Sequence, residues 1–315
     1  MDAINDYNSQ ADSGPQAGFR PLAAPEGRFL AEHGPFMGRL DGDDFRLGLR
    51  IENVHANAGD IAHGGLLMAF ADNQLVVGAM NKLQEFGYLV TVNMTVDFVR
   101  PGTIGGWLEG STTIVRATRN LVFAETMLTV DGEIALRVSG ILKRHNSPPL
   151  DPDNFLTDDV APKTGERGDP NPPEGYRLVN IPGGFLVAIG PLHGQLEGDL
   201  FRFGLRIEKR HCNTSGLCHG GTMMTVADMQ LGPGSMFRTG NFRFKPTIHF
   251  SCDIVSSARE GDWLYGETNV IRLTRNLLFS ETMLYVEGEP VMRASGINKI
   301  VKHDFELISP DTIFA

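Results

Sequence analysis

The chain contains two copies of one sequence. Residues 34–143 align with residues 190–299 without an insertion or deletion, and nearly half of the aligned positions are identical. The segment from Gly48 to Glu52 (GLRIE), for example, returns as Gly204 to Glu208. A repeat of this length is a whole domain, because the units of a solenoid have only about 20–45 residues. We therefore expect two domains of one fold within the 315 residues.

The segments outside the repeats differ from them in composition. Residues 146–180 are rich in Pro, Asp and Gly, offer few apolar side chains to bury, and so predict a linker. Residues 1–26 are similar, and we expect them to be loosely ordered. The predicted divisions are the segment 1–26, a first domain at 27–145, the linker at 146–180, a second domain at 181–303 and a C-terminal tail at 304–315.

Each copy has the pattern of one strand, one long helix and four further strands. Residues 45–52 alternate apolar and polar side chains, as a half-buried strand does. Residues 66–80 are apolar on nearly all sides, which predicts a helix that is buried on most sides. Further strand patterns follow at 88–99, 107–117, 120–130 and 134–143, with a hairpin turn at Asp131-Gly132 that Glu287-Gly288 repeats.

In this α+β unit a single helix is available to cover the apolar face of an antiparallel sheet. A curled sheet wrapped around a central helix is the hot-dog arrangement. One such unit leaves a sheet edge exposed, so we expect the two copies to pair edge to edge. The prediction is a double hot-dog, with two antiparallel sheets each wrapped around a long central helix. The alternative is two independent α+β domains joined by the linker.

The overall composition argues against several classes of protein. The net charge of −10 disfavours a surface for nucleic acid, which needs clustered Lys and Arg. No apolar run approaches the ~18–20 residues that span a bilayer, and the polar N-terminus does not resemble a secretory signal. Three cysteines, all in the second half, suggest no disulfide framework. We expect a cytoplasmic protein that binds neither nucleic acid nor membrane.

Both copies carry the motif Asn-x5-His-Gly-Gly-x6-Asp around the start of the predicted helix. Its aspartate is the most informative residue, because a carboxylate is costly to bury and here lies within an apolar helix. A solvent-facing position is the alternative, although both copies keep the residue. The motif residues are Asn57, His63, Gly64, Gly65 and Asp72 in the first copy and Asn213, His219, Gly220, Gly221 and Asp228 in the second.

Helix geometry separates the two ends of this motif. His63 and Asp72 are nine residues apart, so they point about 180° apart and lie ~13 Å apart along the axis. They cannot meet at one substrate atom. A second helix that runs antiparallel would bring its aspartate to the glycines of the first. We therefore predict two composite sites, one of Asn57, His63, Gly64 and Asp228, the other of Asn213, His219, Gly220 and Asp72.

This combination of groups suits the transfer of an acyl group to water. Amide N–H groups at a helix N-terminus can hold a thioester carbonyl as it becomes an oxyanion, and glycine lets the backbone approach closely. An opposing carboxylate can act as general base on water or attack as a nucleophile. Asn57 and Asn213 could orient the water or the carbonyl. For His63 and His219 the favoured interpretation is a scaffolding role in the loop.

These residues resemble the PaaI-type (phenylacetate-pathway) acyl-CoA thioesterases of the hot-dog superfamily. The match consists of the helix motif, a following strand of the form TV…DF.RP and a hairpin of the form R..R.L.F.E, and it covers most of both repeats. The resemblance implies hydrolysis of an acyl-CoA to the free acid and CoA, without a metal or a bound cofactor. It also implies that Thr91 and Thr247, on the strand after each helix, assist the aspartate of their own copy.

The two copies match the family pattern unequally. Copy two has Gly216 three residues after Asn213, as the family does, whereas copy one has Asp60 at the corresponding place. A second carboxylate there would oppose an oxyanion. Copy one keeps the family strand that contains Thr91. We therefore expect the site of Asn213, His219, Gly220, Asp72 and Thr91 to carry most of the turnover.

A Gly-Pro-Gly sequence sets the helix of copy two apart from that of copy one. Proline inside a helix removes a backbone hydrogen bond and clashes with the preceding turn. Gly232, Pro233 and Gly234 therefore predict that this helix ends early.

Basic and sulfur-containing side chains supply weaker candidates. Two arginines near one hairpin of each copy could contact the phosphates of CoA, although surface solvation explains them about as well; they are Arg116, Arg119, Arg272 and Arg275. Cys212 and Cys218 stand beside histidines, but copy one has alanines at both places. Small apolar packing is the better interpretation, so we predict no metal site.

Two other classes of function are alternatives to a thioesterase. A non-catalytic protein that binds acyl-CoA or lipid would use the same fold without turnover. A hot-dog dehydratase or hydratase would act on related substrates, but the Gly-Asp-x-Asn-Pro-x-x-His signature of that hydratase class is absent from the sequence. From the family resemblance we also expect a homodimer of double hot-dogs.

Overall fold

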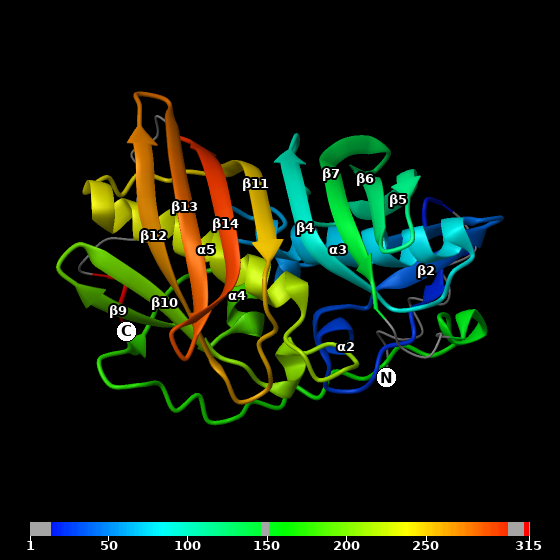
Figure 1. Ribbon diagram of the computed structural model, residues 1–315, viewed down its shortest axis with the longest axis horizontal. Helices are drawn as coiled ribbons and strands as arrows, with labels where there is room; N and C mark the ends of the chain where they lie inside the picture. The colour runs from blue at the N-terminus through cyan, green and yellow to red at the C-terminus, as the bar shows by residue number, and fades with distance from the viewer. Residues whose placement is uncertain (1–13, 146–150, 302–311, 315) are drawn as a thin grey trace.

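The computed structural model describes residues 14–145, 151–301 and 312–314, and its strands form a single antiparallel sheet of 14 strands (Figure 1). The first repeat wraps its part of the sheet around α3 (Gly64–Leu83). Its strands are β2 (Met37–Asp41), β3 (Asp44–Arg50), β4 (Leu89–Phe98), β5 (Trp107–Ala117), β6 (Leu121–Val130) and β7 (Glu133–Arg144).

The second repeat has the same order of elements around α5 (Gly220–Thr239). Its strands are β9 (His193–Glu197), β10 (Leu200–Arg206), β11 (Thr247–Ile254), β12 (Trp263–Leu273), β13 (Leu277–Val286) and β14 (Glu289–Lys299). Short elements complete the described chain, namely the strands β1 (Arg20–Pro21) and β8 (Arg177–Leu178), the helices α2 (Phe29–His33) and α4 (Gly184–Ile189), and the 3-10 turns η1 (Asn53–His55), η2 (Pro152–Asn154) and η3 (Lys209–His211).

The repeats join where β4 pairs antiparallel with β11, in the middle of the sheet (Figure 1). Asn93 donates a hydrogen bond to Asp253 at 2.8 Å, and His249 Nδ1 lies 2.8 Å from Asp97 Oδ1. The prediction of edge-to-edge pairing is therefore confirmed, and independent domains on a linker are excluded. The expectation of two sheets is wrong, because the β4–β11 ladder continues one sheet into the other.

The predicted order of elements within a repeat holds with one addition. A hairpin, β2–β3 in the first repeat and β9–β10 in the second, stands where we expected a single strand. The missed strands have five residues each and include a glycine, so their alternation is weak. The prediction that α5 ends early is also wrong, since it continues through Pro233 to Thr239. Gln230 helps to hold this helix on β10, where its Oε1 accepts from Phe203 N at 2.7 Å.

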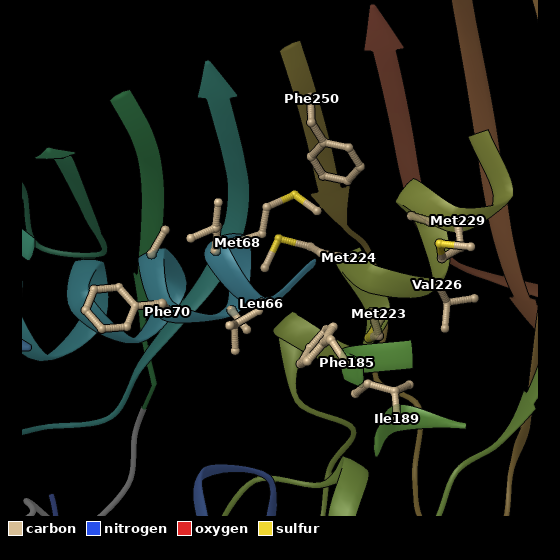
Figure 2. Close-up of a cluster of buried hydrophobic side chains, with 14 of the residues drawn as sticks. Leu66, Met68, Phe70, Phe185, Ile189, Met223, Met224, Val226, Met229 and Phe250 are labelled. Atoms are coloured by element: carbon tan, nitrogen blue, oxygen red, sulfur yellow. The ribbon is translucent and has the colours of Figure 1, made fainter. Parts of the chain in front are cut away.

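The two central helices cross as an antiparallel pair. A Cβ built on Gly65 would lie 2.3 Å from Thr225 Oγ1, and one on Gly221 would lie 2.3 Å from Ala69 Cβ. The earlier residue of α3 (Gly65) thus meets the later residue of α5 (Thr225), and the later residue of α3 (Ala69) meets the earlier one of α5 (Gly221). The helices are therefore antiparallel, as predicted. Around this crossing lies a core shared by both repeats, and Figure 2 shows Met68 and Met224 in the space between the helices.

Several segments outside the predicted domains are held by specific contacts. Phe19 is buried against the Trp107 ring at a centroid distance of 5.1 Å, so the expectation of loose order is wrong at this part of residues 1–26. Within the linker, the amide of Thr164 donates to the Glu32 carboxylate at 2.7 Å. The predicted domain limits stay a prediction, and residues 1–13, 146–150, 302–311 and 315 lie outside the described chain.

Candidate active site

Asp72 lies at the N-terminus of the helix that belongs to the other repeat. Thr91 on β4 donates a hydrogen bond from Oγ1 to Asp72 Oδ1 at 2.6 Å. The second carboxylate oxygen faces α5, because a Cβ built on Gly220 would lie 2.9 Å from Asp72 Oδ2. Asp72 and Gly220, which were predicted to meet from different repeats, are therefore together.

Asp228 has the matching surroundings at the start of α3. Thr247 on β11 donates to Asp228 Oδ1 at 2.7 Å, and a Cβ built on Gly64 would lie 3.3 Å from Asp228 Oδ2. The register of β4 shifts just after Thr91 and that of β11 just after Thr247. Such bulges re-aim side chains. Each composite site thus has one carboxylate oxygen held by a threonine and the other turned to a glycine at a helix N-terminus.

The two carboxyl groups have unusual acidity for the same reason. Burial raises the pKa of Asp72 to about 6, and the hydrogen bond from Thr91 partly opposes this effect. Burial likewise raises the pKa of Asp228 to about 6, against the hydrogen bond from Thr247. A carboxylate with a pKa this close to neutrality is a stronger base than an exposed one while it is still ionised at pH 7.

His63 and His219 cap the two helices. In each, Nδ1 accepts a hydrogen bond of 2.9 Å from the amide two residues later, that of Gly65 or Gly221. Nδ1 therefore carries no proton, and the proton of the neutral ring lies on Nε2. Burial lowers the pKa of both rings to about 4. Both rings are therefore neutral at pH 7, and their Nδ1 atoms hold the first turn of each helix, which is compatible with the scaffolding interpretation. That role stays a prediction.

The second glycine of each motif lies at the helix crossing. Gly65 and Gly221 are buried against Thr225 and Ala69 of the opposite helix, as described above. Close packing of the two helices requires glycine at these positions. The expectation from the sequence that Gly65 and Gly221 bind substrate stays a prediction.

The asparagines of the motif shape their own loops. Asn57 Oδ1 accepts from the amide of Gly59 at 2.8 Å, and Asn213 Oδ1 accepts from Ser215 at 2.9 Å. Asp60 has a φ of 56° and takes the left-handed position that Gly216, with a φ of 75°, takes in the other repeat. Its side chain is exposed, so water screens the charge that we expected to oppose an oxyanion.

The remaining candidates from the sequence are two cysteines and four arginines. Cys212 and Cys218 are buried neighbours across a single β-bridge, and burial raises the pKa of Cys212 to about 11. The four arginines near the hairpins β5–β6 and β12–β13 are exposed, and the structure brings none of them into the lining described below; they are Arg116, Arg119, Arg272 and Arg275.

A cavity of about 430 Å³ opens beside Asp228. The glycine loop of the first repeat forms one side, with His63 and Gly64 in its lining. Leu186 of α4 and Phe98 at the end of β4 add apolar surface. The second repeat supplies the remaining wall from α5, the start of β11 and β14, with Asp228, Met229, Gly232, Met236, Lys245, Thr247 and Asn298 among the lining residues.

Two substitutions between the repeats distinguish this site from the one at Asp72. Gly232 lines the cavity, whereas the aligned residue of α3 is Val76. Met229 also lines it, whereas the aligned Asn73 reaches across to the opposite repeat, with Oδ1 3.4 Å from His219 Nε2. The loop pattern favoured the Asp72 site in the sequence, but the cavity favours the Asp228 site. No sequence signal that we used pointed to Met229, Gly232, Lys245 or Asn298.

Comparisons with known proteins agree with this fold. Residues 59–134 and 215–292 match the sequence profile of the Thioesterase superfamily. A Pseudomonas aeruginosa protein provisionally named an esterase is 31% identical over 128 residues, which are 40% of this chain and 96% of that protein. The chain therefore belongs to the Thioesterase superfamily.

Solved structures show the same double arrangement at low sequence identity. A protein from Novosphingobium aromaticivorans, provisionally named a thioesterase, has a TM-score of 0.60 at 15% identity, with 84% of this chain and 97% of that chain covered. An acyl-CoA thioesterase II from Mycobacterium marinum has a TM-score of 0.54 at 10% identity, with 86% and 96% covered. At these identities the likeness shows the hot-dog fold alone.

Among the described residues, no helix is both long enough and apolar enough to cross a membrane.

Proposed function

We propose that this protein hydrolyses an acyl-CoA thioester to the free acid and CoA at the composite site of Gly64 and Asp228. The observation that carries the proposal is the position of Asp228. Its carboxylate lies in the wall of an apolar cavity, with Oδ2 turned to the N-terminus of α3 from the other repeat. A base and the backbone amide of Gly64 thus lie at the same cavity.

The proposed reaction begins with the thioester carbonyl at the start of α3. The N–H of Gly64 is in the first turn of the helix and has no acceptor within the helix, so it can donate to the carbonyl oxygen. Asp228 takes a proton from a water molecule as the water oxygen bonds to the carbonyl carbon. The oxyanion that forms is stabilised by the helix N-terminus. The C–S bond then breaks, and CoA leaves as the thiolate.

Asp228 could also act as the nucleophile. Its oxygen would bond to the carbonyl carbon and expel the CoA thiolate, and water would hydrolyse the resulting mixed anhydride. Both routes need an ionised carboxylate with one oxygen free of the threonine. The arrangement of Thr247 and Asp228 provides this, because the hydrogen bond from Thr247 leaves Oδ2 available.

The cavity suggests where the parts of the substrate lie. Its mainly apolar walls suit the acyl group. Arg100 stands in the lining at the end of β4 and pairs with Glu133, and its exposed guanidinium suits a phosphate of CoA. Arg272 and Arg275 stay further candidates for such contacts.

A matched pair of substitutions tests the proposal. Released CoA thiol would be measured for Asp228→Asn and Asp72→Asn over a panel of acyl-CoAs. We expect Asp228→Asn to lower kcat by about 100-fold or more, the size of a general-base contribution, and Asp72→Asn to keep most of the activity. The reverse result would place turnover at Asp72. If the parent protein binds acyl-CoAs without releasing thiol, the chain is a binding protein and the proposal is wrong.

A further inference from the structure

Asn298 on β14 lies beside Thr247 and lines the cavity next to Asp228. The two residues are partners in the β11–β14 ladder, and Asn298 is only 1% exposed. Its Nδ2 donates a hydrogen bond of 3.0 Å to Thr247 Oγ1 and one of 3.2 Å to the backbone carbonyl of Lys245. The amide group is therefore hydrogen-bonded to Thr247, the residue that donates to the proposed base Asp228.

The contacts of Asn298 determine the orientation of its amide. The carbonyl of Lys245 can only accept a hydrogen bond, so the atom that faces it must be the nitrogen. Oδ1 is then the remaining atom, and it is buried without a hydrogen-bond partner among the described residues. The orientation of the amide is therefore determined, with its nitrogen toward Thr247 and the carbonyl of Lys245.

The same contacts direct the proton of Thr247. Because Thr247 Oγ1 accepts from Asn298, its own proton must point elsewhere, and Asp228 Oδ1 lies 2.7 Å away. The three side chains form a chain in which Asn298 donates to Thr247 and Thr247 donates to Asp228. The threonine hydroxyl is thereby kept pointing at Oδ1 as a donor, and Oδ2 remains free to face Gly64.

The other repeat lacks this chain. Leu142 aligns with Asn298 and is buried in an apolar cluster with Leu89, which aligns with Lys245. Thr91 still donates to Asp72, but the leucine offers it no hydrogen bond. The amide therefore occurs only at the composite site that has the cavity described above.

We propose that Asn298 is a positioning residue for Asp228, and that it acts through Thr247. It keeps the threonine hydroxyl turned toward the carboxylate, which favours the ionised form and leaves Oδ2 for the reaction. This inference rests on the proposed function. It assigns Asn298 no direct contact with the reacting atoms.

A double-mutant cycle tests the inference. The variants are Asn298→Leu, which introduces the residue of the other repeat, Thr247→Val, which keeps the shape of the threonine, and their combination. We expect Asn298→Leu to lower kcat about tenfold, to change KM by less than about twofold, and to move the acidic limb of the pH profile of kcat/KM to higher pH. In the Thr247→Val background the same change should have no further effect on that limb.

Equal effects of Asn298→Leu in both backgrounds, or an unmoved acidic limb, would overturn the inference. Asn298→Ala removes the amide without added bulk, and it replaces Asn298→Leu in the cycle if thermal unfolding shows that the leucine variant does not fold. Asp228→Asn separates the role of Asn298 from the proposed function itself. If it abolishes activity while Asn298→Leu does nothing, only the role of Asn298 is wrong. If it is silent, the proposed function fails first.

Discussion

Gly65 and Thr225 face each other across the crossing of α3 and α5, so closely that a Cβ on the glycine would lie 2.3 Å from the threonine Oγ1. Thr225 cannot easily move, because its hydroxyl donates to the carbonyl of Gly221 at 2.7 Å. The His-Gly-Gly motif therefore contains two glycines with different tasks. The first is at the site, and the second lets the repeats pack.

This contact predicts different outcomes for alanine at adjacent positions. Gly65→Ala should lower the free energy of unfolding by about 1–3 kcal/mol, the usual cost of overpacking. Gly64→Ala should keep the fold and lose activity, because its Cβ would lie 3.3 Å from Asp228 Oδ2. Urea unfolding and thiol release would measure the two effects. A stable Gly65→Ala variant would show that the helices can separate without cost.

The raised pKa of Asp228 predicts the shape of the pH profile. The proposed base must be ionised, so kcat/KM should rise with pH through about 6 and level off above it. His63, whose pKa is lowered to about 4, would give a limb two units lower if it were the base. Rates from pH 4 to pH 8, corrected for reversible unfolding, would distinguish them. A limb near 4 would contradict the role given to Asp228.

The same shift makes a prediction about stability. Because the pKa of each aspartate is near 6 in the folded protein and near 3.8 when unfolded, the folded state binds more protons between these values. Stability therefore falls as pH rises from about 4 to 6. Asp72→Asn and Asp228→Asn should stabilise the protein by up to about 3 kcal/mol at pH 8 and by little below pH 4. Urea unfolding at both pH values checks this, and a loss of stability at pH 8 would contradict it.

The absence of a side chain at Gly232 is expected to keep the cavity open. A Cβ at this position meets no atom within 4 Å, so a side chain here would begin in free space. Gly232→Val should leave thermal unfolding nearly unchanged and lower kcat/KM for bulky acyl groups about 10- to 100-fold. Val76→Gly is the matched control and should change the rate little. Unchanged rates in Gly232→Val would mean that the acyl group does not occupy this cavity.

Association of the chain can be tested in solution. We expect a homodimer of double hot-dogs, on the basis of the family resemblance alone. Sedimentation or light scattering measures the mass directly. A mass near the 34.4 kDa of one chain would contradict the expectation.

The sequence predicted the antiparallel pairing of α3 and α5, but not which of the two composite sites has the open cavity. Asp72 and Asp228 stood out because burying a carboxylate inside an apolar helix is costly. Their separation from the glycines of their own helix required a second helix. The opening at Gly232 and the role of Asn298 depend on neighbours from other strands, which no local pattern contains. Pro233 misled the prediction because packing on β10 outweighs the local preference of proline.

The β4–β11 ladder also has a consequence for how such a protein can evolve. In a dimer of identical subunits, every substitution appears twice, so both sites change together. Here the partners are encoded separately in one chain, and Val76 can differ from Gly232, or Leu142 from Asn298, without symmetry forcing the same residue on the other half. One half-site can therefore drift toward a purely architectural role while the other specialises, and selection on a single gene preserves the pair.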